Sequence, residues 1–138
     1  MRLFLDTNVL FDLFGTSRPF HIDSLGLVAQ GIAGNVELVV TSSSVMTLVY
    51  SLGRYKLPQK ELVERLNLLL PSMDIAPTSV TELLAGLNSD WSDLEDAIQF
   101  HSALAFGGID AIVSNDKDFK QQKLVPVLTP KQALKRVK

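Results

Sequence analysis

The sequence contains no cysteine, which excludes disulfide bonds, zinc-thiolate sites and thiol nucleophiles together. No apolar run approaches the roughly 18 residues that a membrane-spanning helix needs. The first residues also lack the pattern of a secretory signal, since Asp6 and Asn8 interrupt the apolar run near the start. We therefore expect a soluble protein of a reducing compartment, located in the cytoplasm and without membrane association.

Lysine and arginine are missing from the middle of the chain. The segment from Leu66 to Asp116 has none, whereas the segment from Lys117 to Lys138 is rich in lysine and has Asp118 as its one acid. The acids of the middle segment are Asp74, Glu82, Asp90, Asp93, Glu95, Asp96, Asp110 and Asp116. This distribution suits a protein that holds a metal with one region and contacts a polyanion with another. A solvated acidic helix and a lysine-rich end would also explain the charges.

The chain of 138 residues, with 46% hydrophobic content, is long enough to bury a sizeable core. Short apolar runs typical of strands alternate with segments whose apolar residues recur every three or four positions. The expected strands are 2–5, 36–40, 73–76, 111–113 and the proline-containing edge strand 125–128, and the expected helices are 9–14, 22–32, 45–52, 58–70, 80–87, 92–106 and 130–137. The alternation predicts a single domain, residues 1–138, with a three-layer α/β/α sandwich around a mostly parallel β-sheet.

Polar side chains follow three of the expected strands. Asp6 comes directly after the first strand, a Ser/Thr cluster at 41–44 follows the second, and Ser-Asn-Asp at 114–116 follows the fourth. Ligands of parallel sheets bind beyond the carboxyl ends of the strands, so these side chains should share one edge. Taken singly, Asp6 would cap the next helix and Asp116 would belong to a turn.

Two further acids lie at the start of a helix. Ser92 and Glu95 have the spacing of a capping box, which would make Asp93 the first helical residue and put Asp96 on the same face. Acids in a first helical turn favourably oppose the helix dipole and need no other role. Asp96, however, takes the place where a hydrophobic staple with Trp91 requires an apolar residue, which points to a site.

Carboxylates gathered at one edge repel each other unless a positive charge lies among them. The middle of the chain offers no lysine or arginine, so a divalent cation with oxygen ligands is the simplest neutralising group for Asp6, Asp96 and Asp116. Two other classes that carry acids after strands fit less well. A receiver domain would need an acidic pair before its first acid, and a haloacid-type phosphatase would need aspartate where Asn8 stands.

The segment 3–10, LFLDTNVL, resembles the opening of PIN domains, the nuclease fold of many bacterial type II toxins, including the VapC type. Residues 93–97, DLEDA, and 112–119, IVSNDKDF, resemble the two later motifs of that family, in the same order. The resemblance extends from Met1 to about Pro130. It implies an endonuclease that cleaves single-stranded RNA with Mg²⁺ or Mn²⁺.

The resemblance also implies a role for each matching position. Asp6, Asp96 and Asp116 would bind the metal and, with Asp93, form the catalytic group. Thr7, Asn8 and Ser114 would orient these acids. Such a metal would activate water and stabilise charge on the phosphorus during attack. The basic segment at the end of the chain would supply part of the RNA contacts.

One position departs from the family pattern. Many PIN nucleases carry a glutamate in the helix after the second strand, and this sequence has Thr47 at about that position. A hydroxyl would support a metal-bound water without adding negative charge. Two hypotheses therefore remain: a metal-dependent ribonuclease, or a degenerate PIN module that binds RNA or protein without cutting. The resemblance further implies a small antitoxin protein as a partner and is compatible with a homodimer.

Overall fold

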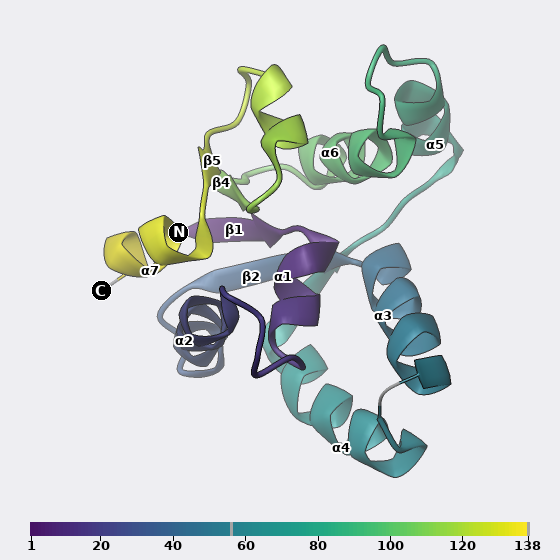
Figure 1. Ribbon diagram of the computed structural model, residues 1–138. Helices are drawn as coiled ribbons and strands as arrows, with labels where there is room; N and C mark the ends of the chain where they lie inside the picture. Colours follow the sequence, from purple (N-terminus) through teal and green to yellow (C-terminus); the bar gives the residue numbers. More distant parts are fainter. Residues whose placement is uncertain (56, 138) are drawn as a thin grey trace.

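The computed structural model describes residues 1–55 and 57–137 and contains a five-stranded parallel sheet with helices on both faces (Figure 1). In chain order the elements are β1 (Arg2–Leu5), α1 (Thr7–Asp12), α2 (His21–Ile32), β2 (Glu37–Thr41), α3 (Ser42–Tyr55), α4 (Gln59–Leu69), η1 (Leu70–Ser72), β3 (Met73–Ala76), α5 (Val80–Leu87), α6 (Leu94–Phe106), β4 (Ala111–Val113), η2 (Lys117–Gln121), β5 (Val127–Leu128) and α7 (Pro130–Val137). The predicted α/β class and the three-layer sandwich are confirmed.

The strands are arranged in the order β3-β2-β1-β4-β5, with β1 in the centre. Phe4 of β1 pairs with Val39 of β2 on one side and with Ile112 of β4 on the other, and every ladder is parallel. The chain thus builds one half of the sheet outward from β1 and then returns to build the other half from β4. A crevice for ligands forms at such a reversal, outside the carboxyl ends of the two central strands.

Side chains of β1 alternate between two hydrophobic clusters, one on each face of the sheet. Leu3 and Leu5 belong to the larger cluster, which packs α1, α2, α3, α4 and α7 against the sheet. Phe4 belongs to the second, with Trp91, Phe100 of α6 and Phe119 of η2. Trp91 stacks on Phe100 with ring centroids 5.3 Å apart and meets Phe119 edge-on at 5.9 Å. This second cluster fixes η2 against the start of α6.

The start of α6 differs from the expectation. Asp93, rather than Ser92, is the N-cap, and its Oδ1 accepts a hydrogen bond from the backbone N–H of Asp96 at 3.0 Å. The predicted capping box of Ser92 and Glu95 is therefore wrong: the helix begins one residue later, at Leu94, and the N–H of its third residue, Asp96, bonds to Asp93. The register that set Asp96 opposite Trp91 in a hydrophobic staple is wrong for the same reason.

The two termini lie close together, with α7 beside the start of β1 (Figure 1). This helix carries the cations Lys131, Lys135 and Arg136. Lys138, which the sequence assigns to the basic segment, lies outside the described residues. Among the helices described, none has both the length and the apolar character needed to cross a membrane.

Candidate metal centre at the carboxyl ends of the central strands

Asp6 lies at the carboxyl end of β1 and is almost completely buried. It occupies the N-cap position of α1, yet its carboxylate makes no capping hydrogen bond to that helix. Its Oδ2 accepts a hydrogen bond from Ser114 Oγ at 2.8 Å instead. The carboxylate is thus bonded to the end of β4, and the backbone N–H groups of Thr7 and Asn8 at the start of α1 also favour its charged form.

The turn after β4 presents two acids at the same edge of the sheet. Ser114 Oγ, which donates to Asp6, also accepts a hydrogen bond from the backbone N–H of Asp116 at 2.9 Å. Asp116 Oδ1 in turn accepts from the backbone N–H of Asp118 at 2.9 Å, where η2 begins. Asp118 is not among the residues predicted from the sequence. The sequence feature that could have indicated Asp118 is its position two residues after Asp116, in the same turn.

One group of three carboxylates could surround a cation, and it differs from the predicted trio. One oxygen each of Asp93, Asp96 and Asp118 lies within 4.8 Å of the other two, close enough for small side-chain movements to bring them around one cation. Asp6 and Asp116 lie near enough to Asp96 to repel its charge. The structure thus gathers the four predicted acids at one edge and adds Asp118 to them.

Burial and mutual repulsion change the acidity of two of these carboxyl groups. Burial raises the pKa of Asp6 to about 6, an effect that the Ser114 hydrogen bond partly offsets and the charge of Asp116 reinforces. Burial also raises the pKa of Asp96 to about 8, with further contributions from the charges of Asp6, Asp93 and Asp116. Near neutral pH the metal-free protein therefore keeps Asp96 mostly protonated.

The arrangement fits a divalent cation. Asp96 Oδ2 is a buried oxygen without a hydrogen-bond partner among the described residues. A buried polar atom left without a partner is costly, and a cation would satisfy it. The ion pairs of Arg2 with Glu37, of Arg18 with Asp12 and of Arg65 with Glu61 all lie outside this group of acids. The donor set consists of carboxylate oxygens, which Mg²⁺ and Mn²⁺ prefer.

A chain of buried hydroxyl groups runs beside the acids. Thr7 Oγ1 lies 2.6 Å from Ser44 Oγ, which also bonds to Thr41 Oγ1 and, at 3.3 Å, to Gln99 Oε1. The backbone N–H groups of Thr7 and Asn8 favour the charged form of Asp6. The Thr7 hydroxyl group instead ties α1 to α3 and α6. Thr47 takes no part in this chain, and its hydroxyl has no hydrogen-bond partner in the described part of the protein. The sequence placed Ser44 at this edge only as one member of the Ser/Thr cluster at 41–44, and it gave no indication of Gln99.

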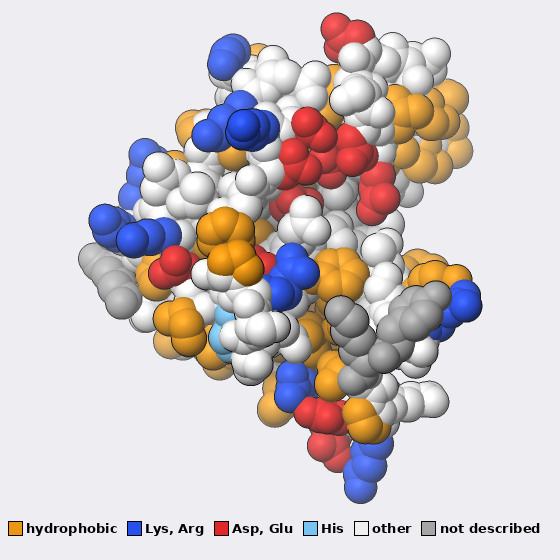
Figure 2. Space-filling view, in the orientation of Figure 1, with side chains coloured by type: hydrophobic (Ala, Val, Ile, Leu, Met, Phe, Trp, Pro, Cys, Tyr) orange, Lys and Arg blue, Asp and Glu red, His pale blue; other side chains and the backbone are white. Residues whose placement is uncertain are grey.

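The cations closest to the acids come from two places in the chain. Lys117 and Arg18 line a hollow together with Asn8, Asp116 and other residues of the same edge. Figure 2 shows acidic side chains gathered in one patch, with Lys and Arg side chains beside it. Of the basic segment, Lys117 at the beginning of η2 lines this hollow.

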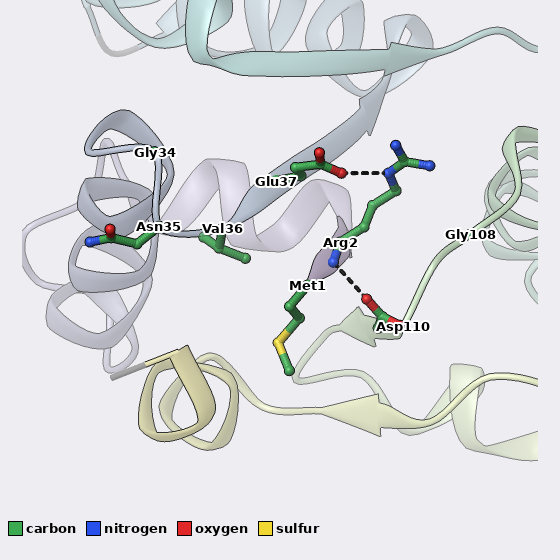
Figure 3. A pocket seen from close by; sticks show the side chains of 8 residues that line it. All are labelled: Met1, Arg2, Gly34, Asn35, Val36, Glu37, Gly108 and Asp110. Carbon is green, nitrogen blue, oxygen red and sulfur yellow. Dashed lines mark hydrogen bonds and ion pairs between the residues drawn. The ribbon is translucent and has the colours of Figure 1, made fainter.

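A second hollow lies at the opposite end of the sheet and contains none of the predicted site residues (Figure 3). Its volume is about 370 Å³. Arg2, at its centre, is already bound: its Nε donates to Glu37 Oε2 and its backbone N–H to Asp110 Oδ2, each at 2.8 Å. These residues start β1 and β2 or precede β4, so the hollow is far from the carboxyl ends where the acids lie.

We expect the metal-free protein to lose stability as the pH rises from about 4 to about 8. The folded pKa values of Asp6 and Asp96 are about 6 and about 8, against an ordinary value of 3.8. In this window the folded state holds protons that the unfolded chain has released, so the stabilisation is complete below pH 4 and lost as the pH passes the folded pKa values. Thermal unfolding in EDTA should show a melting temperature lower by about 5 °C or more near pH 8 than near pH 5.

The matched control for this pH dependence is Asp74→Asn, which removes an exposed acid of β3 away from the site. This variant should keep the slope of the wild-type protein. A melting temperature that rises between these pH values in the wild-type protein would contradict the raised pKa values.

Comparisons with known proteins agree with the fold and the motifs. Residues 3–124 match the PIN domain. The chain is 28% identical over 141 residues to Ribonuclease VapC1 of Aquifex aeolicus (strain VF5), covering 98% of this chain and 94% of that protein.

Two solved structures share the fold. One is VapBC2 from Rickettsia felis bound to a DNA fragment from their promoter, with a TM-score of 0.66, 18% identity, and coverage of 94% of this chain and 98% of that chain. The other is a toxin-antitoxin complex from Klebsiella pneumoniae, with a TM-score of 0.60, 20% identity, and coverage of 93% and 97%.

Proposed function

The chain belongs to the PIN domain family, and from that membership we propose that it is a metal-dependent endoribonuclease that cleaves single-stranded RNA. The observation that carries the proposal is the cluster of acids around Asp96, whose buried Oδ2 has no hydrogen-bond partner among residues 1–55 and 57–137. The similarity to Ribonuclease VapC1 supports the choice of RNA as the substrate.

In this proposal Asp6, Asp96 and Asp116 hold Mg²⁺ or Mn²⁺, and Asp93 and Asp118 complete the ring of carboxylates. Such an ion would supply a Lewis acid that activates water and neutralises charge on the phosphate. Ser114 holds Asp6 in place through its 2.8 Å hydrogen bond. Asn8, which lines the same hollow as Asp116, faces the substrate side of the acids.

This chain lacks the glutamate that many PIN nucleases carry in the helix after the second strand, but the other acids of the site are present. The first turns of α3 carry no acid, and Ser44 rather than Thr47 bonds to the residues around the acids. Asp118 supplies a further carboxylate beside Asp93 and Asp96, which compensates for the missing negative charge. We therefore favour a catalytic PIN domain over a degenerate module that binds RNA or protein without cutting.

We also propose a protein antitoxin as a partner. Both solved structures that share the fold are described as complexes of a toxin with its antitoxin, or as VapBC assemblies. A homodimer, expected from the resemblance, stays a prediction. Co-expression with the adjacent open reading frame, followed by co-purification, would test the antitoxin directly.

The function is tested by cleavage of a labelled single-stranded RNA with Mg²⁺, with Mn²⁺ or with EDTA. We expect cleavage with either ion, none in EDTA, and a loss of more than about 100-fold in Asp116→Asn, since even groups that only orient a metal ligand contribute about 10- to 100-fold. The exposed acid variant Asp74→Asn should cleave as the wild type does. Undiminished cleavage by Asp116→Asn would rule out this site as the catalyst. Calorimetric Mn²⁺ binding without any cleavage would favour the non-catalytic module.

A further inference from the structure

A hollow of about 550 Å³ opens beside the acids, and its lining includes Arg18, the Asp12 that pairs with it, and Phe20. On one side it is lined by Asp116, Lys117 and Asp118, and on the other by Arg18 and Phe20. A ligand bound to the acids through a cation would therefore extend toward a guanidinium group and an aromatic ring.

Arg18 is held in a fixed orientation. Its Nε donates to Asp12 Oδ1 at 2.8 Å, and the other oxygen of this fully buried carboxylate accepts from Ser24 Oγ at 3.0 Å. Its aliphatic stem packs on Gly15, where an added Cβ would lie 2.6 Å from the Arg18 Cδ. The stem and Nε are thus fixed, while the side chain remains 43% exposed.

The two terminal nitrogens of Arg18 remain available for a ligand. They make no hydrogen bond to any residue in the described part of the chain. A guanidinium group presents its donors in a planar fork that matches the oxygens of a phosphate, and prior fixation of the side chain reduces the entropy lost on binding. The positive charge of the guanidinium group would attract the negative charge of such a phosphate.

Phe20 supplies the second element of this wall. It is 41% exposed although it is a large apolar side chain, and it occupies the N-cap position of α2, where a polar residue is usual. The position is well ordered, because its carbonyl accepts from the backbone N–H of Ser24 and the adjacent His21 Nδ1 lies 2.6 Å from the carbonyl oxygen of Asp12. An exposed, fixed aromatic ring is the surface on which a nucleic acid base stacks.

We propose that Arg18 and Phe20 form a nucleotide-binding subsite for single-stranded RNA, in which Arg18 binds the phosphate next to the cleaved bond and Phe20 stacks on the adjoining base. This assignment rests on the proposed function for the identity of the cleaved bond. The binding contacts themselves do not require cleavage, so the two are tested separately.

Binding is measured by fluorescence anisotropy with a labelled single-stranded RNA of mixed sequence, using the full-length Asp96→Asn protein as the parent so that the RNA stays intact. We expect Arg18→Lys and Phe20→Leu each to weaken binding about tenfold. The first substitution removes the planar pair of guanidinium donors, and the second removes the ring on which a base stacks. Arg18→Lys keeps a cation beside the buried Asp12. Gly15→Ala, which displaces the Arg18 stem, should weaken binding in the same way.

Matched controls remove similar groups elsewhere. Ile22→Ala deletes an exposed apolar side chain in the first turn of α2, and Lys135→Ala deletes a cation of α7. Neither residue lines the hollow, and both variants should bind RNA as the parent does.

An abasic sugar-phosphate oligomer of equal length distinguishes the phosphate contact from the base contact. With it, Arg18→Lys should still weaken binding, whereas Phe20→Leu should have no effect.

Each result decides one assignment. Binding unchanged in Arg18→Lys, Gly15→Ala and Phe20→Leu, with folding verified by circular dichroism, would overturn the subsite, even if the wild-type protein cleaves RNA. No binding of RNA by the parent at micromolar concentration would overturn it as well. Weakened binding in these variants together with an inactive wild-type protein would support the subsite and reject the ribonuclease function.

Discussion

Asp96→Asn is expected to abolish RNA cleavage and, at the same time, to make the metal-free protein more stable near pH 8. The loss of activity should exceed about 100-fold, because a direct metal ligand matters more than the groups that orient one, which contribute about 10- to 100-fold. The gain in stability follows from the raised pKa of Asp96, about 8, which reflects burial and repulsion by Asp6, Asp93 and Asp116. Asparagine carries no charge, and its amide can donate to the neighbouring carboxylates.

The two effects of Asp96→Asn have separate measurements. Melting temperatures in EDTA near pH 5 and near pH 8 should show a shallower decline in the variant than in the wild type, because the titration of Asp96 is removed. Added Mn²⁺ should raise the melting temperature of the wild type and leave the variant nearly unchanged. A variant that is less stable than the wild type near pH 8 in EDTA would mean that the Asp96 carboxylate makes a net favourable contact without metal.

Phe119→Ala is expected to cost about 3–5 kcal/mol of the free energy of unfolding, the range for removing a large aromatic side chain from a core. Phe119 is fully buried and meets Trp91 edge-on in the cluster that joins η2 to α6. The free energy of unfolding of a natural domain is about 5–15 kcal/mol, so this substitution removes a large share of it. Because η2 carries Asp118 at its start, the variant should also bind Mn²⁺ more weakly.

Leu124→Ala is the matched control for Phe119→Ala. Leu124 follows η2 by a few residues and is 75% exposed, so its truncation should change the stability by less than about 0.5 kcal/mol. Both variants are compared by urea denaturation. A loss below about 1 kcal/mol for Phe119→Ala would show that η2 does not depend on this core for its position.

The sequence by itself determined the order and nature of most elements. The strand at Met73–Ala76 and the helix at Val80–Leu87 lie at the predicted residues, because short apolar runs and the helical spacing of apolar residues are local properties of the chain. The placement of Asp6 and of Ser114-Asn115-Asp116 at one edge was also predictable. Parallel strands leave their carboxyl ends on the same side, whatever the details of packing.

Helix boundaries were less well determined, because capping depends on which side chain reaches the free N–H groups. The spacing of Ser92 and Glu95 predicted a cap at Ser92, and the structure uses Asp93 instead. Asp6 lies at the N-cap position that the sequence predicted, but its carboxylate also bonds to Ser114, which is 108 residues away. Contacts at that separation are not encoded in local spacing.

The composition of the site was decided by the tertiary structure. Asp118 joins Asp93 and Asp96 only because the buried Phe119 holds η2 against the start of α6, so that residues distant in sequence present their carboxylates to one another. Arg18 reaches the same hollow because the buried carboxylate of Asp12 fixes its guanidinium group. The sequence determined that acids would lie at the carboxyl ends of the central strands; only the packing of side chains between elements determined which of them meet and which cation faces them.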